Sequence, residues 1–346
     1  MKPALIVHVA GARPNFMKIA PLMAACAARS ELRSRLVHTG QHYDERMSRL
    51  FFEELDIPRP DVDLEVGSGS HAAQTALVLQ RLEPLLVDWR PALVLVVGDV
   101  NSTLAAALAA SKLGVAVAHV EAGLRSFDRT MPEELNRVVT DAIADLLFVS
   151  EPAGLENLAR EGVDPRRVHF VGNVMIDTLL AHRQRARASA ILEQLGVAAG
   201  AYAVLTLHRP ANVDDPATLG GVLGPIIELS TRLPVIFPVH PRAQAAVARA
   251  LGPGSARGVR VVAPLGYLDF LRLMMDARLV LTDSGGIQEE TTVLGVPCLT
   301  LRENTERPVT VTDGTNRIVG SDPERIVAAW RDVVTRNGHP VSRPPL

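Results

Sequence analysis

The chain has little of several features that would define its class. Its 346 residues include only two cysteines, Cys26 and Cys298. Each lies in an apolar stretch, so we expect buried, reduced thiols and neither a disulfide nor a cysteine metal site. The net charge is −2, which argues against nucleic acid or an anionic membrane as a general partner. No apolar run is long enough to span a membrane, and the short N-terminal run leads into a Gly-Ala-Arg-Pro loop without a cleavage site, so we expect a cytoplasmic protein.

What the chain does have is a repeated alternation of short apolar runs and amphipathic segments. The alternation predicts buried parallel strands covered by helices. It continues on both sides of residue 172, and 346 residues are ample for two domains. The sequence therefore predicts an α/β protein with two doubly wound domains, residues 1–172 and 173–346. Residues 173–200 are expected to form a long helix and a linker.

Polar clusters follow the predicted strands at their carboxyl ends. Asp99 follows the apolar run 93–97, and Glu121 follows the run 115–120. Open α/β sheets bind ligands outside the carboxyl ends of their strands, so these clusters predict a ligand cleft. In the second half, similar clusters begin at His208, His240, Asp283 and Arg302.

A helix is predicted to begin at Pro132, with acidic residues in its first turn. Apolar residues at helical spacing predict the side of this helix that packs inward: Leu135, Val138, Val139, Ala142, Ile143 and Leu146. Glu133 and Arg137 are one turn apart and can pair. Compensation of the helix dipole accounts for the helix acids but not for Glu121.

The best anion-binding signal in the chain is Ser284-Gly285-Gly286, which opens a predicted helix. Glu290, about one turn later, is placed to accept hydrogen bonds from a ribose diol. Arg307 is a candidate for a further phosphate contact. A weaker signal is the loop 11–15, followed by a predicted helix over residues 16–29.

Arg13 and Lys18 accompany this weaker signal. Both are cations near a helix N-terminus, where the helix dipole disfavours them, so either an anionic ligand or surface exposure explains their position. The loop 11–15 is not a GxGxxG or Walker pattern, which makes this signal weak by itself.

Two or more carboxylates in one cleft suit acid/base chemistry on carbon or oxygen. The first half offers Asp99, Glu121, Glu133 and Glu134 together with Arg13 and Lys18, and His208 and His240 face them from the second half. The sequence contains no serine or cysteine nucleophile elbow. The histidines of the loop 37–43 lack a third ligand at metal-binding spacing.

These stretches together resemble the non-hydrolysing UDP-N-acetylglucosamine 2-epimerases. The matching segments are Gly11 to Pro14 with Lys18, Thr39 to His42, Gly98-Asp99, His119 to Arg125, Pro132 to Arg137, His208-Arg209, Pro238 to Pro241, Thr282 to Glu290 and Thr305 to Pro308. The resemblance implies the glycosyltransferase-B architecture, in which two Rossmann-like domains flank a cleft. It also implies reversible inversion at C2 of the sugar, giving UDP-N-acetylmannosamine.

The mechanism that the resemblance implies removes the C2 proton, releases UDP from C1 to give 2-acetamidoglucal, and adds UDP back. Carried over to the matching positions, the catalytic residues are Asp99, Glu121, Glu133 and His208. The residues that bind the substrate and UDP are Arg13, Lys18, Arg137, His240, Phe270, Ser284, Gly285, Gly286, Glu290 and Arg307. A regulatory role falls on Gln41, His42 and Arg209. The resemblance implies no redox cofactor and no metal, and it predicts a homodimer.

The chain departs from its relatives at two places. They usually continue into a last helix that packs across onto the first domain, and we expect this crossover helix to be missing after Leu346. Bacterial relatives often carry a second, activating substrate site near the Gln-His loop. Here Tyr43 and Asp44 follow that loop and residues 66–71 lack the basic residue expected there, which leaves substrate activation open.

Three other functions share part of this pattern. A 2-epimerase of UDP-2,3-diacetamido-2,3-dideoxyglucuronic acid shares Ser126-Phe127 and the segment from Met131 to Glu134. A hydrolysing epimerase would release UDP and N-acetylmannosamine, but such relatives usually differ over Val120 to Arg125. A catalytically silent nucleotide-sugar sensor would have no need of the carboxylates.

Overall fold

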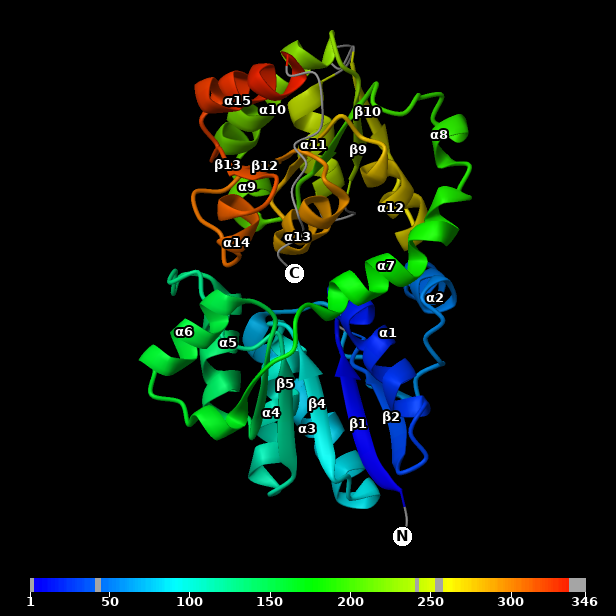
Figure 1. Cartoon of the computed structure of the whole chain (residues 1–346), viewed down its shortest axis with the longest axis vertical. Helices are drawn as coiled ribbons and strands as arrows, with labels where there is room; N and C mark the ends of the chain where they lie inside the picture. The colour runs from blue at the N-terminus through cyan, green and yellow to red at the C-terminus, as the bar shows by residue number, and fades with distance from the viewer. Residues whose placement is uncertain (1–2, 41–44, 240–242, 253–257, 336–346) are drawn as a thin grey trace. The chain divides into compact units, whose positions relative to one another are not determined.

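The computed structural model describes residues 3–40, 45–239, 243–252 and 258–335, except for the side chains of residues 13, 45–48 and 210, and divides into two compact units (Figure 1). The first unit extends to Thr178 and the second begins at Leu179. This division lies inside helix α7, Val174–Arg187, six residues beyond the predicted boundary at residue 172.

The first unit is built around a seven-stranded sheet in the order β3-β2-β1-β4-β5-β6-β7, with every pair parallel. Its elements are β1 Ala4–Ala10, α1 Arg13–Ala27, β2 Leu32–His38, α2 Glu45–Glu54, β3 Val62–Asp63, α3 His71–Trp89, β4 Leu93–Val97, α4 Asn101–Lys112, β5 Ala116–Val120, α5 Pro132–Ile143, β6 Leu146–Val149, α6 Pro152–Arg160, a 3₁₀ turn at Pro165–Arg167 and β7 Val168–Phe170. The strand order doubles back at β1, as in doubly wound folds.

The second unit is built around a six-stranded sheet in the order β10-β9-β8-β11-β12-β13, again with parallel pairs. Its elements after α7 are α8 Ile191–Gln194, β8 Ala203–Thr206, α9 Pro210–Val213, α10 Pro216–Ser230, β9 Val235–Pro238, α11 Gln244–Leu251, β10 Val259–Val262, α12 Tyr267–Met275, β11 Leu279–Thr282, α13 Gly285–Leu294, β12 Cys298–Thr300, α14 Val309–Thr312, β13 Asn316–Ile318 and α15 Pro323–Thr335. The two parallel sheets confirm the predicted α/β class.

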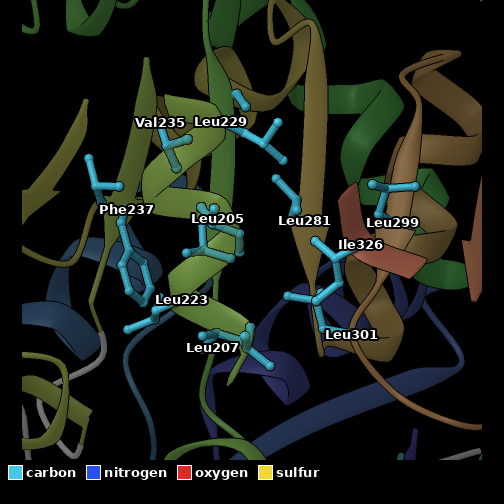
Figure 2. Packing of buried hydrophobic residues seen from close by; sticks show 14 of the residues in the cluster. Leu205, Leu207, Leu223, Leu229, Val235, Phe237, Leu281, Leu299, Leu301 and Ile326 are labelled. Carbon is cyan, nitrogen blue, oxygen red and sulfur yellow. The ribbon is translucent and has the colours of Figure 1, made fainter. Parts of the chain in front are cut away.

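Apolar strands packed against helices form the core of each unit. In the second unit, Leu205 of β8 and Leu281 of β11 are fully buried and lie among side chains such as Leu223 of α10 and Ile326 of α15 (Figure 2). In the first unit, the strand valines pack against α4, whose alanines at 105–107, 109 and 110 are all buried. Small side chains let α4 approach the sheet closely. The strands are therefore covered, as the near-continuous apolar runs predicted.

Helix α1 begins earlier than predicted. It starts at Arg13, whereas the sequence had suggested a loop through Asn15. Proline at the start of a helix loses no hydrogen bond, so Pro14 belongs to the first turn. The Oδ1 atom of Asn15 accepts hydrogen bonds from the backbone N–H groups of Gly11 and Ala12, both at 3.0 Å. These bonds tie the loop after β1 to the helix.

The orientation predicted for α5 is wrong. Leu135, Val138 and Val139 are 40–42% exposed, whereas the opposite side of the helix is buried. The buried residues are Glu134, Asn136, Arg137, Thr140 and Asp141. Helical periodicity identifies two faces but does not say which one packs inward. Here the polar face is buried because loops and ion pairs within the unit satisfy it.

The two cysteines are free thiols, one in each unit. Cys298 is buried as predicted, and burial raises the pKa of its thiol to about 12, whereas Cys26 is half-buried. Among the described residues, no helix combines the length and apolarity needed to cross a membrane.

Candidate functional site

The carboxyl edge of the first sheet holds a buried ion pair. Glu121 follows β5 directly, and its carboxylate pairs with the ammonium of Lys18 on α1. Both side chains are over 90% buried. In this structure the anion beside Lys18 is therefore a carboxylate of its own unit. A buried charge is tolerated when it is paired, and this pair brings α1 to the end of β5.

The backbone around this pair is constrained. Glu121 has a φ of 74°, a left-handed backbone conformation that residues other than glycine rarely adopt. Such a residue costs about 1–3 kcal/mol and persists only where its surroundings hold it. Gly98, at the end of β4, also has positive φ, and a Cβ there would lie 2.9 Å from Lys18 Nζ. Glycine at position 98 therefore leaves room for the pair.

Asp99, the next residue, is bound by α5. Its carboxylate pairs with Arg137 NH1, and Asn136 donates a hydrogen bond of 2.8 Å to its backbone oxygen. The N-cap of α4 is Val100, without a side-chain cap, so Asp99 does not cap this helix. Asp99 is thus held by the helix that begins at Pro132.

Arg137, predicted to bind substrate, is almost fully buried and also pairs with Glu134 at 2.6 Å. Glu134 in turn accepts hydrogen bonds of 2.9 Å from the backbone N–H groups of Ser126 and Phe127. Burial raises the pKa of Glu134, but these bonds and the Arg137 guanidinium outweigh it, so the net pKa is lowered. The carboxylate therefore anchors the loop after β5 to the helix. Glu133, the neighbouring catalytic candidate, is only half-buried.

A second buried network supports this edge and was not predicted as part of the site. His119 Nδ1 lies 2.6 Å from Asp141 Oδ1, and its Nε2 lies 2.8 Å from the carbonyl oxygen of Gly98. Asp141 also pairs with Arg125 at 2.7 Å and accepts from Gly123 N at 3.0 Å. Burial opposes the charge of Asp141, but His119 and Arg125 outweigh it and lower the pKa of the carboxyl. The network links the ends of β4 and β5 to α5.

In the second unit, the first turn of α13 presents backbone N–H groups without intrahelical partners, as every helix start does. Gly285 lies against Arg307, since a Cβ at position 285 would be 2.5 Å from Arg307 NH1. Arg307 is buried and pairs with Glu289 at 2.7 Å. A guanidinium and helix amides thus converge at one point, an arrangement suited to a phosphate group.

Glu306 gathers further cations around this point. It pairs with Arg302 at 2.9 Å and with Arg209 at 3.2 Å, and Arg307 lies 3.8 Å away. Burial raises the pKa of Glu306, but the three guanidinium groups and the hydrogen bond from Arg302 outweigh it and hold the pKa far below its usual range. Arg209, predicted to be regulatory, belongs to this cluster.

Of the other predicted residues, Glu290 lies on α13 itself and Phe270 lies on α12. Glu290 is buried and its Oε1 lies 3.2 Å from the hydroxyl of Tyr267. Burial, opposed by that hydrogen bond and reinforced by Glu289, raises the pKa of Glu290 to about 8. Phe270 on α12 is half-buried.

His208 is paired with the carboxylate of Asp283, which was not predicted as a site residue. Its Nδ1 lies 2.8 Å from Asp283 Oδ1, and its side chain is 46% exposed. Asp283 is fully buried. Burial raises its pKa, but His208 and two backbone N–H groups outweigh this and lower the pKa to about 2. The sequence signal was its place in the cluster that follows β11, one residue before the glycine loop.

The remaining predicted residues are divided between the two units. The first unit contributes Lys18, Asp99, Glu121, Glu133 and Arg137, and the second contributes His208, Arg209, Phe270, Ser284, Gly285, Gly286, Glu290 and Arg307. Gln41, His42, His240 and the side chain of Arg13 lie outside the described part of the chain. Within that part, no group of three or more His, Cys, Asp or Glu side chains is arranged to hold a metal ion.

Comparison with solved structures finds a similar fold in a glycotransferase. The glycotransferase of kitacinnamycin matches with a TM-score of 0.56 over 97% of this chain and 92% of that chain, at 14% identity. At so low an identity the likeness concerns the fold alone.

The family is narrower than the fold class. The model of the UDP-N-acetylglucosamine 2-epimerase family matches residues 24–344. The chain belongs to this family, and the resemblance of its motifs is confirmed. A UDP-N-acetylglucosamine 2-epimerase of Methanococcus maripaludis is 40% identical over 96% of this chain and 92% of its own length. The UDP-2,3-diacetamido-2,3-dideoxy-D-glucuronate 2-epimerase of Pseudomonas aeruginosa is 42% identical over 94% and 91%.

Solved structures of family members agree with this assignment. The UDP-GlcNAc 2-epimerase of Methanocaldococcus jannaschii, in complex with UDP-GlcNAc and UDP, has a TM-score of 0.91 and 39% identity, covering 99% of this chain and 96% of that chain. The enzyme from Neisseria meningitidis bound to UDP-GlcNAc has a TM-score of 0.88 and 30% identity, covering 95% and 91%.

The raised pKa of Glu290 gives a testable dependence of stability on pH. The folded protein holds this proton up to about pH 8, whereas the unfolded chain releases it near 4.5. Between these values the folded state binds more protons, so the contribution of Glu290 to folding stability is fully present below pH 4.5 and is lost as pH rises through 8. One proton corresponds to a slope of at most about 1.4 kcal/mol per pH unit.

Glu290→Gln should therefore flatten the fall in the free energy of unfolding across this pH range. Urea denaturation at intervals of one pH unit measures the slope. Glu228→Gln is the matched control, since Glu228 is exposed on α10 in the same unit and should leave the slope unchanged. Parallel slopes for the wild type and Glu290→Gln would show that Glu290 does not hold its proton.

Proposed function

We propose that the protein is a non-hydrolysing epimerase that interconverts UDP-N-acetylglucosamine and UDP-N-acetylmannosamine. The observation that carries the proposal is the convergence of Asp99 and Glu121 at one edge of the first sheet, each paired with a cation of its own unit. Membership of the UDP-N-acetylglucosamine 2-epimerase family supports it. So do the relatives whose structures contain UDP-GlcNAc and UDP.

The proposed reaction is an elimination followed by an addition. A base takes the C2 proton, the C–H electron pair forms the C1–C2 double bond, and the C1–O bond breaks with its electrons on UDP. The intermediate is 2-acetamidoglucal. Protonation of C2 on the other face, with attack of the UDP oxygen on C1, completes the inversion. We assign the proton transfers to the group Asp99, Glu121, Glu133 and His208, since removal and return on two faces need more than one acid/base group.

The residues that we assign to UDP binding lie mainly in the second unit. We assign the diphosphate to the first turn of α13 with Arg307, the ribose to Glu290, and a further contact to Phe270. An elimination leaves UDP detached from the sugar, so the enzyme must retain it until re-addition. Buried guanidinium groups and helix amides serve that purpose, because charge-assisted hydrogen bonds to phosphate are strong in a protein interior. The family likeness extends the site to Lys18, Arg137, Arg13 and His240.

A second candidate substrate is UDP-2,3-diacetamido-2,3-dideoxyglucuronic acid, because a relative that is named as a 2-epimerase of this sugar nucleotide is 42% identical to the chain. The same elimination and addition would apply to it. Incubation of each nucleotide sugar with the enzyme in D₂O, followed by NMR, separates these substrates and also detects hydrolysis. Free N-acetylmannosamine as the accumulating product would contradict the non-hydrolysing assignment.

Glu121→Gln tests the chemistry of the first unit. Glutamine keeps the size of the side chain but removes its charge, so turnover should fall by roughly a hundredfold or more, the usual scale for a lost acid or base. UDP affinity should be retained. In the wild type, solvent deuterium should enter C2, because the abstracted proton exchanges with water before one is returned.

The matched control for this variant is Glu156→Gln, which changes an exposed glutamate on α6 of the same unit. Its turnover should equal that of the wild type. Near-normal turnover of Glu121→Gln would remove Glu121 from the mechanism, and product without C2 deuterium would point to a different route.

Gly285→Val tests the assignment of the diphosphate. A Cβ at position 285 would lie 2.5 Å from Arg307 NH1, so valine must displace that guanidinium from the helix start. We expect UDP affinity, measured by calorimetry, to fall at least tenfold, which corresponds to about 1.4 kcal/mol. Gly224→Ala is the control, because a Cβ there meets nothing within 4 Å. Wild-type affinity in a folded Gly285→Val protein would show that the diphosphate binds elsewhere.

We also propose that the protein is a homodimer and that the exposed apolar face of α5 contributes to its interface. This face consists of Leu135, Val138, Val139 and Ala142. In a two-fold dimer the same surface serves both subunits, so one apolar helix face can cover its own copy. Such contiguous exposed apolar surface is typical of protein interfaces.

Val138→Glu tests this interface. A carboxylate at the centre of an apolar contact remains unpaired, so the dimer should dissociate at micromolar concentration, as measured by analytical ultracentrifugation. The control is Val261→Glu on β10, where the replaced valine is 47% exposed in the second unit. A wild-type monomer, or an undisturbed Val138→Glu dimer, would contradict the assignment.

A further inference from the structure

We infer that Asp283 is a positioning residue for His208: its carboxylate fixes the proton of the imidazole on Nδ1 and leaves Nε2 as the atom that meets the ligand. The inference rests on the proposed function and extends it to a residue outside the carboxylate set of the first unit.

The two residues meet because β8 and β11 are adjacent parallel strands. Thr206 at the end of β8 pairs in register with Thr282 at the end of β11, and their hydroxyl oxygens lie 2.7 Å apart. His208 follows two residues after the first strand, and Asp283 follows directly after the second. The pairing of the strands therefore sets the distance of 2.8 Å between Nδ1 and the carboxylate.

Four donor groups surround the carboxylate of Asp283. Besides the imidazole, they are the backbone N–H groups of His208 and Arg209, each at 3.0 Å, and Nδ2 of Asn212 at 3.1 Å. The side chain has no exposed surface. A buried carboxylate with this many donors stays ionised, and an ionised carboxylate only accepts hydrogen bonds. The proton that faces it must therefore be on Nδ1 of His208.

This tautomer determines what the imidazole can do. The ring is 46% exposed, and with Nδ1 committed to Asp283, Nε2 is the nitrogen left to interact with a ligand. When Nε2 takes up a proton, the resulting positive charge lies beside a buried carboxylate that stabilises it. The imidazolium can then donate a hydrogen bond to an oxygen of the departing diphosphate and keeps both its proton and that hydrogen bond until the diphosphate is added back to C1. No covalent bond to the imidazole is formed.

The same carboxylate links the imidazole to the anion-binding point. Asp283 immediately precedes Ser284, the N-cap of α13. Arg209, whose backbone N–H binds Asp283, also donates from Nε to the backbone oxygen of Asp283 at 3.2 Å and pairs with Glu306. Asp283 therefore lies between the imidazole and the first residue of the helix.

The same contacts would be present if Asp283 had only a structural role, because Asp283 anchors the loop after β8. The two roles differ in how the effect reaches catalysis. If Asp283 acts through His208, removing its charge matters only while His208 is present. If Asp283 only holds the loop, the loss of turnover caused by removing its charge adds to the loss caused by removing His208. UDP affinity and folding stability then fall as well.

A double-mutant cycle with Asp283→Asn and His208→Gln separates these roles. We expect each single variant to lower kcat by roughly a hundredfold, the scale of a lost acid/base group, with little change in UDP affinity. The double variant should fall within about threefold of His208→Gln alone, because the two residues act as a unit. Losses that multiply, or a UDP affinity that falls in parallel with kcat, would overturn the inference.

NMR of ¹⁵N-histidine-labelled protein provides a readout that does not depend on turnover. In the wild type, neutral His208 should show the Nδ1–H tautomer, and Asp283→Asn should alter that signal. Wild-type His208 in the Nε2–H tautomer would overturn the inference, even if Asp283→Asn failed to fold. Absence of epimerisation by the wild type would instead overturn the proposed function and leave the tautomer readout decisive.

Asn212→Ala is the matched control for the loop. Nδ2 of Asn212 donates to Asp283 and to the backbone oxygen of Leu301, but it does not bind the imidazole. The variant removes one donor from the same carboxylate and should lower thermal stability while leaving the tautomer of His208 unchanged. A change of tautomer in Asn212→Ala equal to that in Asp283→Asn would show that the loop, and not the carboxylate charge, holds the ring.

Discussion

Parallel pairing of strands is the constraint on which both candidate sites depend. In the first unit β4 and β5 end level with each other, and in the second unit β8 and β11 do so. Residues that follow these strands are therefore neighbours although they are separated by 22 positions in one case, Asp99 and Glu121, and by 75 in the other, His208 and Asp283. Antiparallel pairing would have sent the same residues to opposite ends of the sheet.

The second constraint is that charge buried at these edges must be compensated. Lys18 and Glu121 neutralise each other, and Arg137 lies between two carboxylates. Where partners of opposite charge are provided, the groups stay ionised. Glu290, beside Tyr267 and Glu289, instead keeps its proton up to about pH 8. The same carboxylate chemistry thus gives charged and neutral groups in one protein, according to the neighbours that the fold supplies.

Much of the fold and part of the site could be predicted from the sequence. Strands buried on both faces have apolar runs that are visible without a structure, and the residues that end these runs, such as Asp99 and Glu121, were placed at the sheet edge for that reason. Their partners were not predictable in the same way. The contact of His119 with Asp141 and that of His208 with Asp283 depend on register between distant segments, and no local pattern records the register.

Helix α5 shows where a local rule fails and why. Its spacing separates an apolar face from a polar one, and the hydrophobic effect alone would bury the face with Val138. The structure buries the face with Arg137 and Asp141, because each of these groups finds a partner: Asp99 and Glu134 for the first, His119 and Arg125 for the second. Burying these two charged groups is tolerated because each is paired, since an unpaired charge in the interior is costly. The polar side of α5 is therefore the inward side, because neighbouring segments supply those partners, and the apolar side is left exposed on the unit.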